Sequence, residues 1–247
     1  MIERIDLSDI LFLDVECVSE QANFEELSED FKTLWRIKGR QQLRVPEEDF
    51  TEEMAVESYA DKAGIFAEFG KIVCISVGII HRDKDDQRLR LRLKSYADRD
   101  EKKLLEDFSA LIKQFYNNRN LCGHNIKEFD IPYICRRMVV NQLELPPALD
   151  LYGKKPWETK HLLDTLELWK FGDRKNYTSL KLLAAVLGFP SPKDDIDGSE
   201  VGRVFWEEDN LERIAFYCEK DVLATVQLFL RFRRMPLLEE DQIAHVE

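Results

Sequence analysis

Ile10-Leu11-Phe12-Leu13-Asp14-Val15-Glu16-Cys17 is an apolar run that leads into two carboxylates one residue apart. Four consecutive apolar residues indicate a strand that is buried on both faces. Side chains alternate between the two faces of a strand, so Asp14 and Glu16 emerge on the same side. Two neighbouring carboxylates repel each other, and a divalent cation is the usual compensation. The alternative is that the strand simply ends here, with both side chains in water.

Composition sets limits on the kind of protein. The 247 residues suggest one or two domains, and the 44% hydrophobic content suffices for a sizeable core. The formal net charge of −12 argues against a protein that coats nucleic acid electrostatically, because such proteins usually carry a basic surface. The charge does not exclude an enzyme that grips a short strand end through bound metal ions.

The cysteines and the apolar runs indicate the compartment. No signal peptide and no run of transmembrane length is found in the sequence. The five cysteines are odd in number and contain no Cys-x-x-Cys pair. They therefore argue against a disulfide framework or a zinc site, and they predict reduced thiols in a cytoplasm.

Hydrophobic periodicity predicts the order of the elements. Beyond the first strand, residues 19–62 form an acidic insertion, predicted to be helical from the spacing of Phe24, Leu27, Phe31, Leu34 and Trp35. Further strands are predicted over residues 71–80, 89–96 and 120–123. Helices are predicted over residues 100–116, 129–141, 179–187, 199–207 and 210–233.

This order predicts an α/β domain in which a mixed sheet is flanked by helices. The first three strands are expected to form a meander, with the strand at residues 120–123 beside the first. Residues 1–235 are expected to form a single domain. Residues 236–247 are expected to be an acidic tail that is disordered at its end.

A second carboxylate segment runs from Gly123 to Asp130, between a short strand and a helix. Gly123 permits a tight turn, and Asn125 can bond the backbone or a ligand in that turn. Asp130 falls in the first turn of the following helix. Helix capping is the alternative to a metal-binding role for Asp130. The spare acid Asp164 could cap a helix or support the metal ligands, and capping is the favoured interpretation.

A third segment lies inside the last predicted helix. Tyr217 and Asp221 are four residues apart, so they project from one face of that helix. An inward-facing Asp is costly unless it is paired or binds a metal, and a phenol one turn earlier could hold a water at a reacting centre. Alternatively, Asp221 is solvated and Tyr217 covers the core.

Together the three segments resemble the 3′–5′ exonucleases of the DnaQ-like, DEDD superfamily, and most of all the proofreading domains of family B DNA polymerases. The likeness covers nearly the whole chain in the right order, and it implies a ribonuclease H-like fold. Tyr217 stands four residues before Asp221, as in the Tyr-containing (DEDDy) branch. The His-containing branch needs a histidine at position 216, which is Phe216 here. Cys17-Val18-Ser19 departs from the usual family residues beside the nucleotide.

The resemblance also implies a set of site residues and two divalent ions, Mg²⁺ or Mn²⁺. Asp14 would bridge both ions, Glu16 and Asp221 would complete the site of the ion that activates water, and Asp130 would help hold the other. Tyr217 would orient the attacking water. Asn125 and Phe129 would lie near the terminal nucleotides of the substrate.

The implied function is a metal-dependent 3′–5′ exonuclease that releases nucleoside monophosphates from single-stranded nucleic acid, with DNA favoured. An exoribonuclease is the alternative within the same chemistry, and a catalytically idle nucleic-acid-binding or scaffold module is the alternative of another class. Because no polymerase domain follows Arg234, the protein is expected to act alone or with a separate protein partner. The expected partners are the 3′ ends of single-stranded DNA or RNA, not a membrane.

Overall fold

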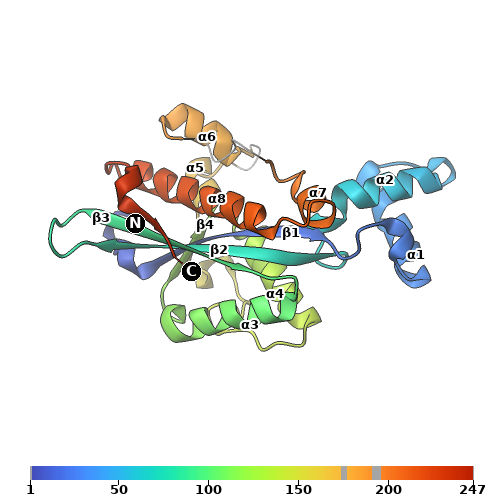
Figure 1. Ribbon diagram of the computed structural model, residues 1–247, viewed down its shortest axis with the longest axis horizontal. Coiled ribbons are helices and arrows are strands. Elements are labelled where there is room, and N and C mark those ends of the chain that lie inside the picture. The colour runs from blue at the N-terminus through green and yellow to red at the C-terminus, as the bar shows by residue number, and fades with distance from the viewer. Residues whose placement is uncertain (1, 174–176, 191–195, 247) are drawn as a thin grey trace.

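A computed structural model describes residues 2–173, 177–190 and 196–246. Within these residues the strands form one six-stranded mixed sheet in the order β5-β4-β1-β2-β3-β6 (Figure 1). The predicted α/β class is confirmed. The strands are β1 (Ile10–Ser19), β2 (Gly70–Arg82), β3 (Leu89–Ala97), β4 (Asn120–Gly123), β5 (Leu162–Asp164) and β6 (Ile243–His245).

Strand pairing confirms the predicted meander and the place of β4. β1 runs antiparallel to β2, and β2 runs antiparallel to β3. β4 pairs in parallel with β1, but only as far as the Phe12–Cys122 pair. Beyond Phe12, β1 therefore loses its neighbour on that side. Asp14 and Glu16 lie in this part of β1.

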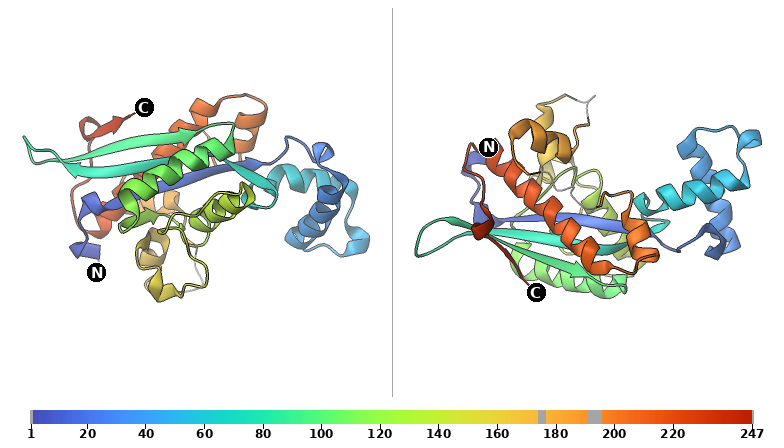
Figure 2. Two further views of the ribbon diagram at one scale, coloured as in Figure 1. Left: turned by 90° about the horizontal axis from the view of Figure 1, so that it is seen from below. Right: turned by 45° about the horizontal axis from the view of Figure 1, so that its top comes forward.

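Helices cover both faces of the sheet. The helices are α1 (Glu29–Leu43), α2 (Glu52–Lys62), α3 (Glu101–Leu111), α4 (Asp130–Val140), α5 (Thr165–Lys170), α6 (Leu180–Leu187), α7 (Val201–Trp206) and α8 (Leu211–Phe232). The long helix α8 crosses one face, and α3 and α4 lie on the other (Figures 1 and 2). Leu11 and Leu13 of β1 pack in the core with α3 and α4, whereas Ile10 and Phe12 pack with α8.

The acidic insertion forms an arm, defined as residues 20–69, that extends beyond one end of the sheet (Figures 1 and 2). Its helical character is confirmed, but α1 begins at Glu29, where Ser28 caps it, and Phe24 lies in a separate 3₁₀ turn. The arm has its own small core around Trp35, whose indole donates to the carbonyl of Ala55 at 3.0 Å.

Two strands and the character of the tail were not predicted. β5 and β6 have three residues each, too few for a periodic signal. The tail was expected to be disordered at its end, but its residues 243–245 form a strand, and residue 247 lies outside the described residues. Ile243–His245 pairs with β3, and the Gln242 side chain donates to the Leu89 carbonyl at 2.6 Å. In the described part of the chain, no helix has both the length and the apolarity to cross a membrane.

Candidate active site

Asp14 and Glu16 lie on the α8 side of the sheet. Even-numbered residues of β1 share the face of Phe12, which packs against Phe229 of α8 with ring centroids 5.6 Å apart. Glu16 is 7% exposed, and Asp14 is partly buried. A register irregularity in the β1–β2 pairing follows directly after Glu16. The prediction that both carboxylates emerge on one face is confirmed, and the wet strand tip is excluded for Glu16.

Asp130 approaches these two carboxylates along the edge of β1 that does not pair with β2. It is the first residue of α4, its side chain is 4% exposed, and it accepts a hydrogen bond from the backbone of Val15. The N-cap of α4 is Phe129, and no side-chain capping bond is formed there. Asp130 therefore takes the place beside β1 that β4 leaves open.

The loop between β4 and α4 is built to bring Asp130 close to the sheet. A Cβ atom at Gly123 would lie 2.9 Å from the Cβ of Ile126 and 3.0 Å from the Leu13 carbonyl oxygen, so only glycine fits. Asn125 adopts a left-handed conformation with φ 67°, which asparagine tolerates. Phe129 is half-buried beside Tyr133, with ring centroids 5.5 Å apart.

Asp164 fastens this loop. Its carboxylate caps α5, as predicted, by accepting from the amides of Leu166 at 2.9 Å and Glu167 at 3.3 Å. It also accepts from the amides of Asn125 at 3.0 Å and Lys127 at 3.1 Å. The sequence did not predict these two loop contacts, because they depend on the β4–β5 pairing that places Gly123 beside Asp164.

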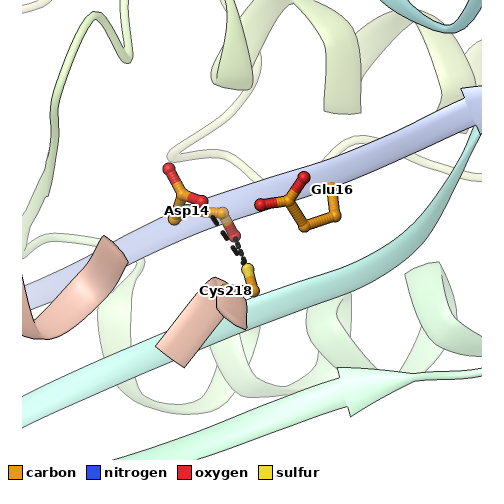
Figure 3. A group of neighbouring side chains, drawn as sticks. All are labelled: Asp14, Glu16 and Cys218. Carbon is orange, nitrogen blue, oxygen red and sulfur yellow. Dashed lines mark hydrogen bonds between the residues drawn. The ribbon is translucent and has the colours of Figure 1, made fainter. Parts of the chain in front are cut away.

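Helix α8 supplies the remaining predicted residues. Tyr217 is 6% exposed and its hydroxyl hydrogen-bonds the Asp221 carboxylate one turn later. Between them, Cys218 is fully buried, and its Sγ lies 3.4 Å from the Asp14 carbonyl oxygen and 3.7 Å from Asp14 Oδ2 (Figure 3). The one-face prediction for Tyr217 and Asp221 is confirmed. The sequence analysis gave Cys218 no role, because its contact with Asp14 spans 204 residues.

The carboxylates raise one another's pKa. Burial, followed by the charges of Asp221, Asp130 and Glu16, raises the pKa of Asp14 well above its ordinary value. The pKa of Asp130 rises to about 7, chiefly through burial. Among the described residues, no lysine, arginine or histidine forms an ion pair with Asp14 or Asp130. Like charges held together in this way favour a bound cation.

Burial raises the pKa of the Tyr217 phenol, and so do the neighbouring charges of Asp221, Glu16 and Asp14. Tyr217 therefore stays protonated at neutral pH. It can donate a hydrogen bond, but it cannot act as a base.

One ligand atom from each of Asp14, Glu16 and Cys218 forms a group within 4.8 Å (Figure 3). Asp130 and Asp221 lie outside this group, yet both are near enough to raise the pKa of Asp14. The oxygen donors suit Mg²⁺ or Mn²⁺. The residues therefore fit a divalent ion bound between β1 and α8.

Tyr177 is a further residue that the sequence analysis missed. It is 68% exposed, and its pKa is raised by burial and by the charges of Asp130, Asp14, Asp164 and Asp221. Its phenol therefore lies at the rim of the carboxylate site. No sequence signal marks it.

The segment that carries Tyr177 is held to the β4–α4 loop by His124. The ring of His124 bonds the Thr178 carbonyl and the Thr165 hydroxyl, both at 2.9 Å. Burial lowers the pKa of His124, so its ring is neutral and serves as a link between loops.

Comparisons with known proteins give the family of the chain and a structure of similar fold. Residues 65–245 match a protein family described as a predicted 3′–5′ exonuclease related to the exonuclease domain of PolB. No curated protein matches the chain. Among solved structures, the fold is similar to that of the family B DNA polymerase from the hyperthermophilic archaeon Pyrobaculum calidifontis, with a TM-score of 0.52 and 14% identity. The match covers 90% of this chain but only 24% of the polymerase chain.

Proposed function

Since the chain belongs to the family of predicted 3′–5′ exonucleases related to the exonuclease domain of PolB, we propose that it hydrolyses single-stranded nucleic acid from the 3′ end, with DNA as the favoured substrate. The observation that carries this proposal is the approach of Asp14, Glu16, Asp130 and Asp221 to one another from β1, α4 and α8. All four carboxylates come from this chain, so we expect its 247 residues to suffice for activity.

Asp14, Glu16, Asp130 and Asp221 would hold two divalent ions, Mg²⁺ or Mn²⁺, with Asp14 shared between them. When bound, the two ions supply positive charge that stabilises the attacking and leaving oxygens at phosphorus. The β1 backbone fixes Asp14 and Glu16 on one face. The hydrogen bond that the Val15 backbone donates holds the Asp130 carboxylate beside Asp14 and Glu16.

Tyr217 would hold the attacking water. Its phenol, whose O–H donates to the Asp221 carboxylate, would accept a hydrogen bond from the water and turn a lone pair of the water oxygen towards phosphorus. The water gives up a proton to the solvent and its oxygen bonds to phosphorus, while the bond from phosphorus to the 3′ oxygen of the preceding nucleotide breaks. That 3′ oxygen takes up a proton, and a nucleoside 5′-monophosphate is released.

Asn125 and Phe129 would contact the terminal nucleotides. Both belong to the β4–α4 loop, which is hydrogen-bonded to Asp164. One segment of the chain would therefore position both the 3′ end of the nucleic acid and Asp130. Aromatic contacts with bases tolerate any sequence. An RNA 3′ end presents the same phosphodiester, and exoribonuclease activity is therefore the alternative to test directly.

The experiment is release of a 3′-end label from matched single-stranded DNA and RNA oligonucleotides, with Mg²⁺ or Mn²⁺ and with chelator. Asp221→Asn should lower the rate by at least about 10²-fold, as is typical when a group that stabilises transition-state charge is lost. The matched control is Asp107→Asn, an exposed carboxylate of α3 on the opposite face of the sheet. It should retain the wild-type rate.

The outcomes separate the candidate functions. Stepwise shortening of DNA that needs metal and Asp221 supports the proposal, whereas shortening of RNA alone establishes the exoribonuclease. A folded wild-type protein that shortens neither strand would instead support an idle binding or scaffold module.

A further inference from the structure

Cys218 gives the candidate metal site a sulfur donor. Its thiol lies on α8, is fully buried, and lies beside Asp14 on the side of β1 that also carries Glu16 (Figure 3). The ligand atoms of the three residues lie within 4.8 Å of one another. Cys218 stands 204 residues from Asp14 in the sequence, so no local spacing marks the group.

The distance between the sulfur of Cys218 and a carboxylate oxygen of Asp14 can be compared with the S···O separation around a zinc ion. A tetrahedral zinc ion bonds sulfur at about 2.3 Å and carboxylate oxygen at about 2.0–2.2 Å, so its S···O edge is roughly 3.5 Å. The Cys218 Sγ to Asp14 Oδ2 distance is 3.7 Å. The pair thus already has nearly the separation that zinc demands.

The chemistry of the donors points to the same class of ion. Mg²⁺ takes oxygen ligands in a near-octahedral shell, and a thiol is not one of them. Thiolates favour zinc and softer ions. Two carboxylates and one thiolate would supply three protein ligands, the number found in many zinc sites that keep one position open.

We propose that Asp14, Glu16 and Cys218 bind a thiophilic divalent cation of the zinc class, which competes with Mg²⁺ for the same two carboxylates. On binding, the S–H bond of Cys218 breaks, a sulfur–metal bond forms, and the proton passes to the solvent. The proposal shares Asp14 and Glu16 with the proposed function but does not require nuclease activity. Zinc would inhibit the enzyme, because the Cys218 sulfur would hold it on the two carboxylates that Mg²⁺ needs.

Cobalt(II) is the probe, because it replaces zinc and gives a thiolate-to-metal charge-transfer absorption in the near ultraviolet only when sulfur is a ligand. The wild-type protein should develop this absorption up to one equivalent of Co²⁺, and added Zn²⁺ should abolish it. Cys218→Ala should lose it. The matched control is Cys122→Ala, another fully buried thiol, which lies in β4 and should retain the absorption.

Cys74 needs its own variant because its thiol hydrogen-bonds that of Cys218. Cys74→Ala should also retain the absorption. If Cys74→Ala loses the absorption and Cys218→Ala retains it, Cys218 is not the sulfur ligand and the proposal is overturned. Glu16→Gln should weaken Co²⁺ binding at least about tenfold with Cys218 intact, which tests the site even if a cysteine variant fails to fold. A folded wild-type protein without thiolate absorption refutes the proposal outright.

Inhibition provides a second, independent measurement. The Zn²⁺ concentration that halves Mg²⁺-dependent nuclease activity should rise at least about tenfold in Cys218→Ala, with each protein compared to its own rate. Thiolate absorption without any nuclease activity would count against the proposed function alone. Nuclease activity without thiolate absorption would count against the zinc site alone.

Discussion

Two groups of buried carboxylates in this protein have opposite surroundings. Glu101, at the start of α3, is 7% exposed and pairs with Arg137 of α4 at 2.6 Å. It also accepts from the Ile72 amide at 2.7 Å and from the Asn141 side chain at 2.8 Å. Arg137 in turn pairs with Glu20 at 3.0 Å. This first group carries its own positive charge.

The second group is the carboxylate site around Asp14 and Asp130. There, burial is accompanied by further carboxylates, and the pKa of each of these two residues rises. The comparison shows that the fold can neutralise a buried acid with an arginine. At the site between β1 and α8 the described residues provide no such partner for Asp14 or Asp130. An external cation can supply what Arg137 supplies to Glu101.

The largest expected effect comes from removing the internal cation. Arg137→Met leaves Glu101 buried without its guanidinium, and we expect a loss of about 3–5 kcal/mol in the free energy of unfolding. Urea denaturation measures it. The neighbouring Arg136 is exposed, so Arg136→Met should cost under about 0.5 kcal/mol. Equal losses in the two variants would show that the ion pair is not what distinguishes Glu101.

Neutralising a carboxylate of the second group should raise the free energy of unfolding, whereas Arg137→Met lowers it. The pKa of Asp130 is about 7 when folded against an ordinary 3.8, so its ionisation costs folding free energy increasingly above pH ~4 and fully above pH ~7. In chelator at pH 8, Asp130→Asn should therefore raise stability by about 2 kcal/mol, or roughly 4–8 °C in Tm.

The pH and a matched variant check this interpretation. At pH 5 the gain from Asp130→Asn should fall to less than half, because the folded carboxyl is then largely protonated. Glu101→Gln, the equivalent change in the first group, should lower Tm at pH 8. A decrease for Asp130→Asn at pH 8 would contradict the assignment of Asp130 to an uncompensated site.

The smallest expected effect is the pH dependence of metal stabilisation. Asp14 and Asp130 must lose their protons to bind Mg²⁺, and their raised pKa values make this harder in acid. The rise in Tm on adding Mg²⁺ should therefore be greater at pH 8 than at pH 5.5, by about 1 kcal/mol or roughly 2–4 °C. Asp14→Asn should abolish the rise at both pH values, and a rise that survives in this variant would place the ion elsewhere.

The sequence predicted the parts of the fold that carry a local signal. Strands β1 to β4 and the helices that cover them follow from apolar periodicity, and Ser28 and Asp100 cap α1 and α3 as such residues commonly do. The paired carboxylates of β1 and the Tyr217–Asp221 spacing of α8 also follow from local rules, because one strand or one helix places both members.

What the sequence did not reveal depends on contacts across the fold. Strand β6 is three residues long and exists because the edge of β3 is available to it. Cys218 lies at the site because α8 packs over β1, and Tyr177 lies there through the His124–Thr178 bond. None of these contacts produces a periodic pattern in the sequence. The positions of Cys218 and Tyr177 at the site therefore became apparent only in the structure.

The arm between β1 and β2 begins and ends at adjacent points, because Ser19 pairs with Gly70 in the sheet. In polymer terms the arm is a closed loop, and the entropy of closing such a loop grows only logarithmically with its length. Each doubling costs about 0.6 kcal/mol. Residues added to the exposed turns of the arm would therefore cost little closure entropy, provided that the core around Trp35 is kept. The register that aligns Asp14 with Ser76 is fixed by the strands themselves and is insulated from such changes.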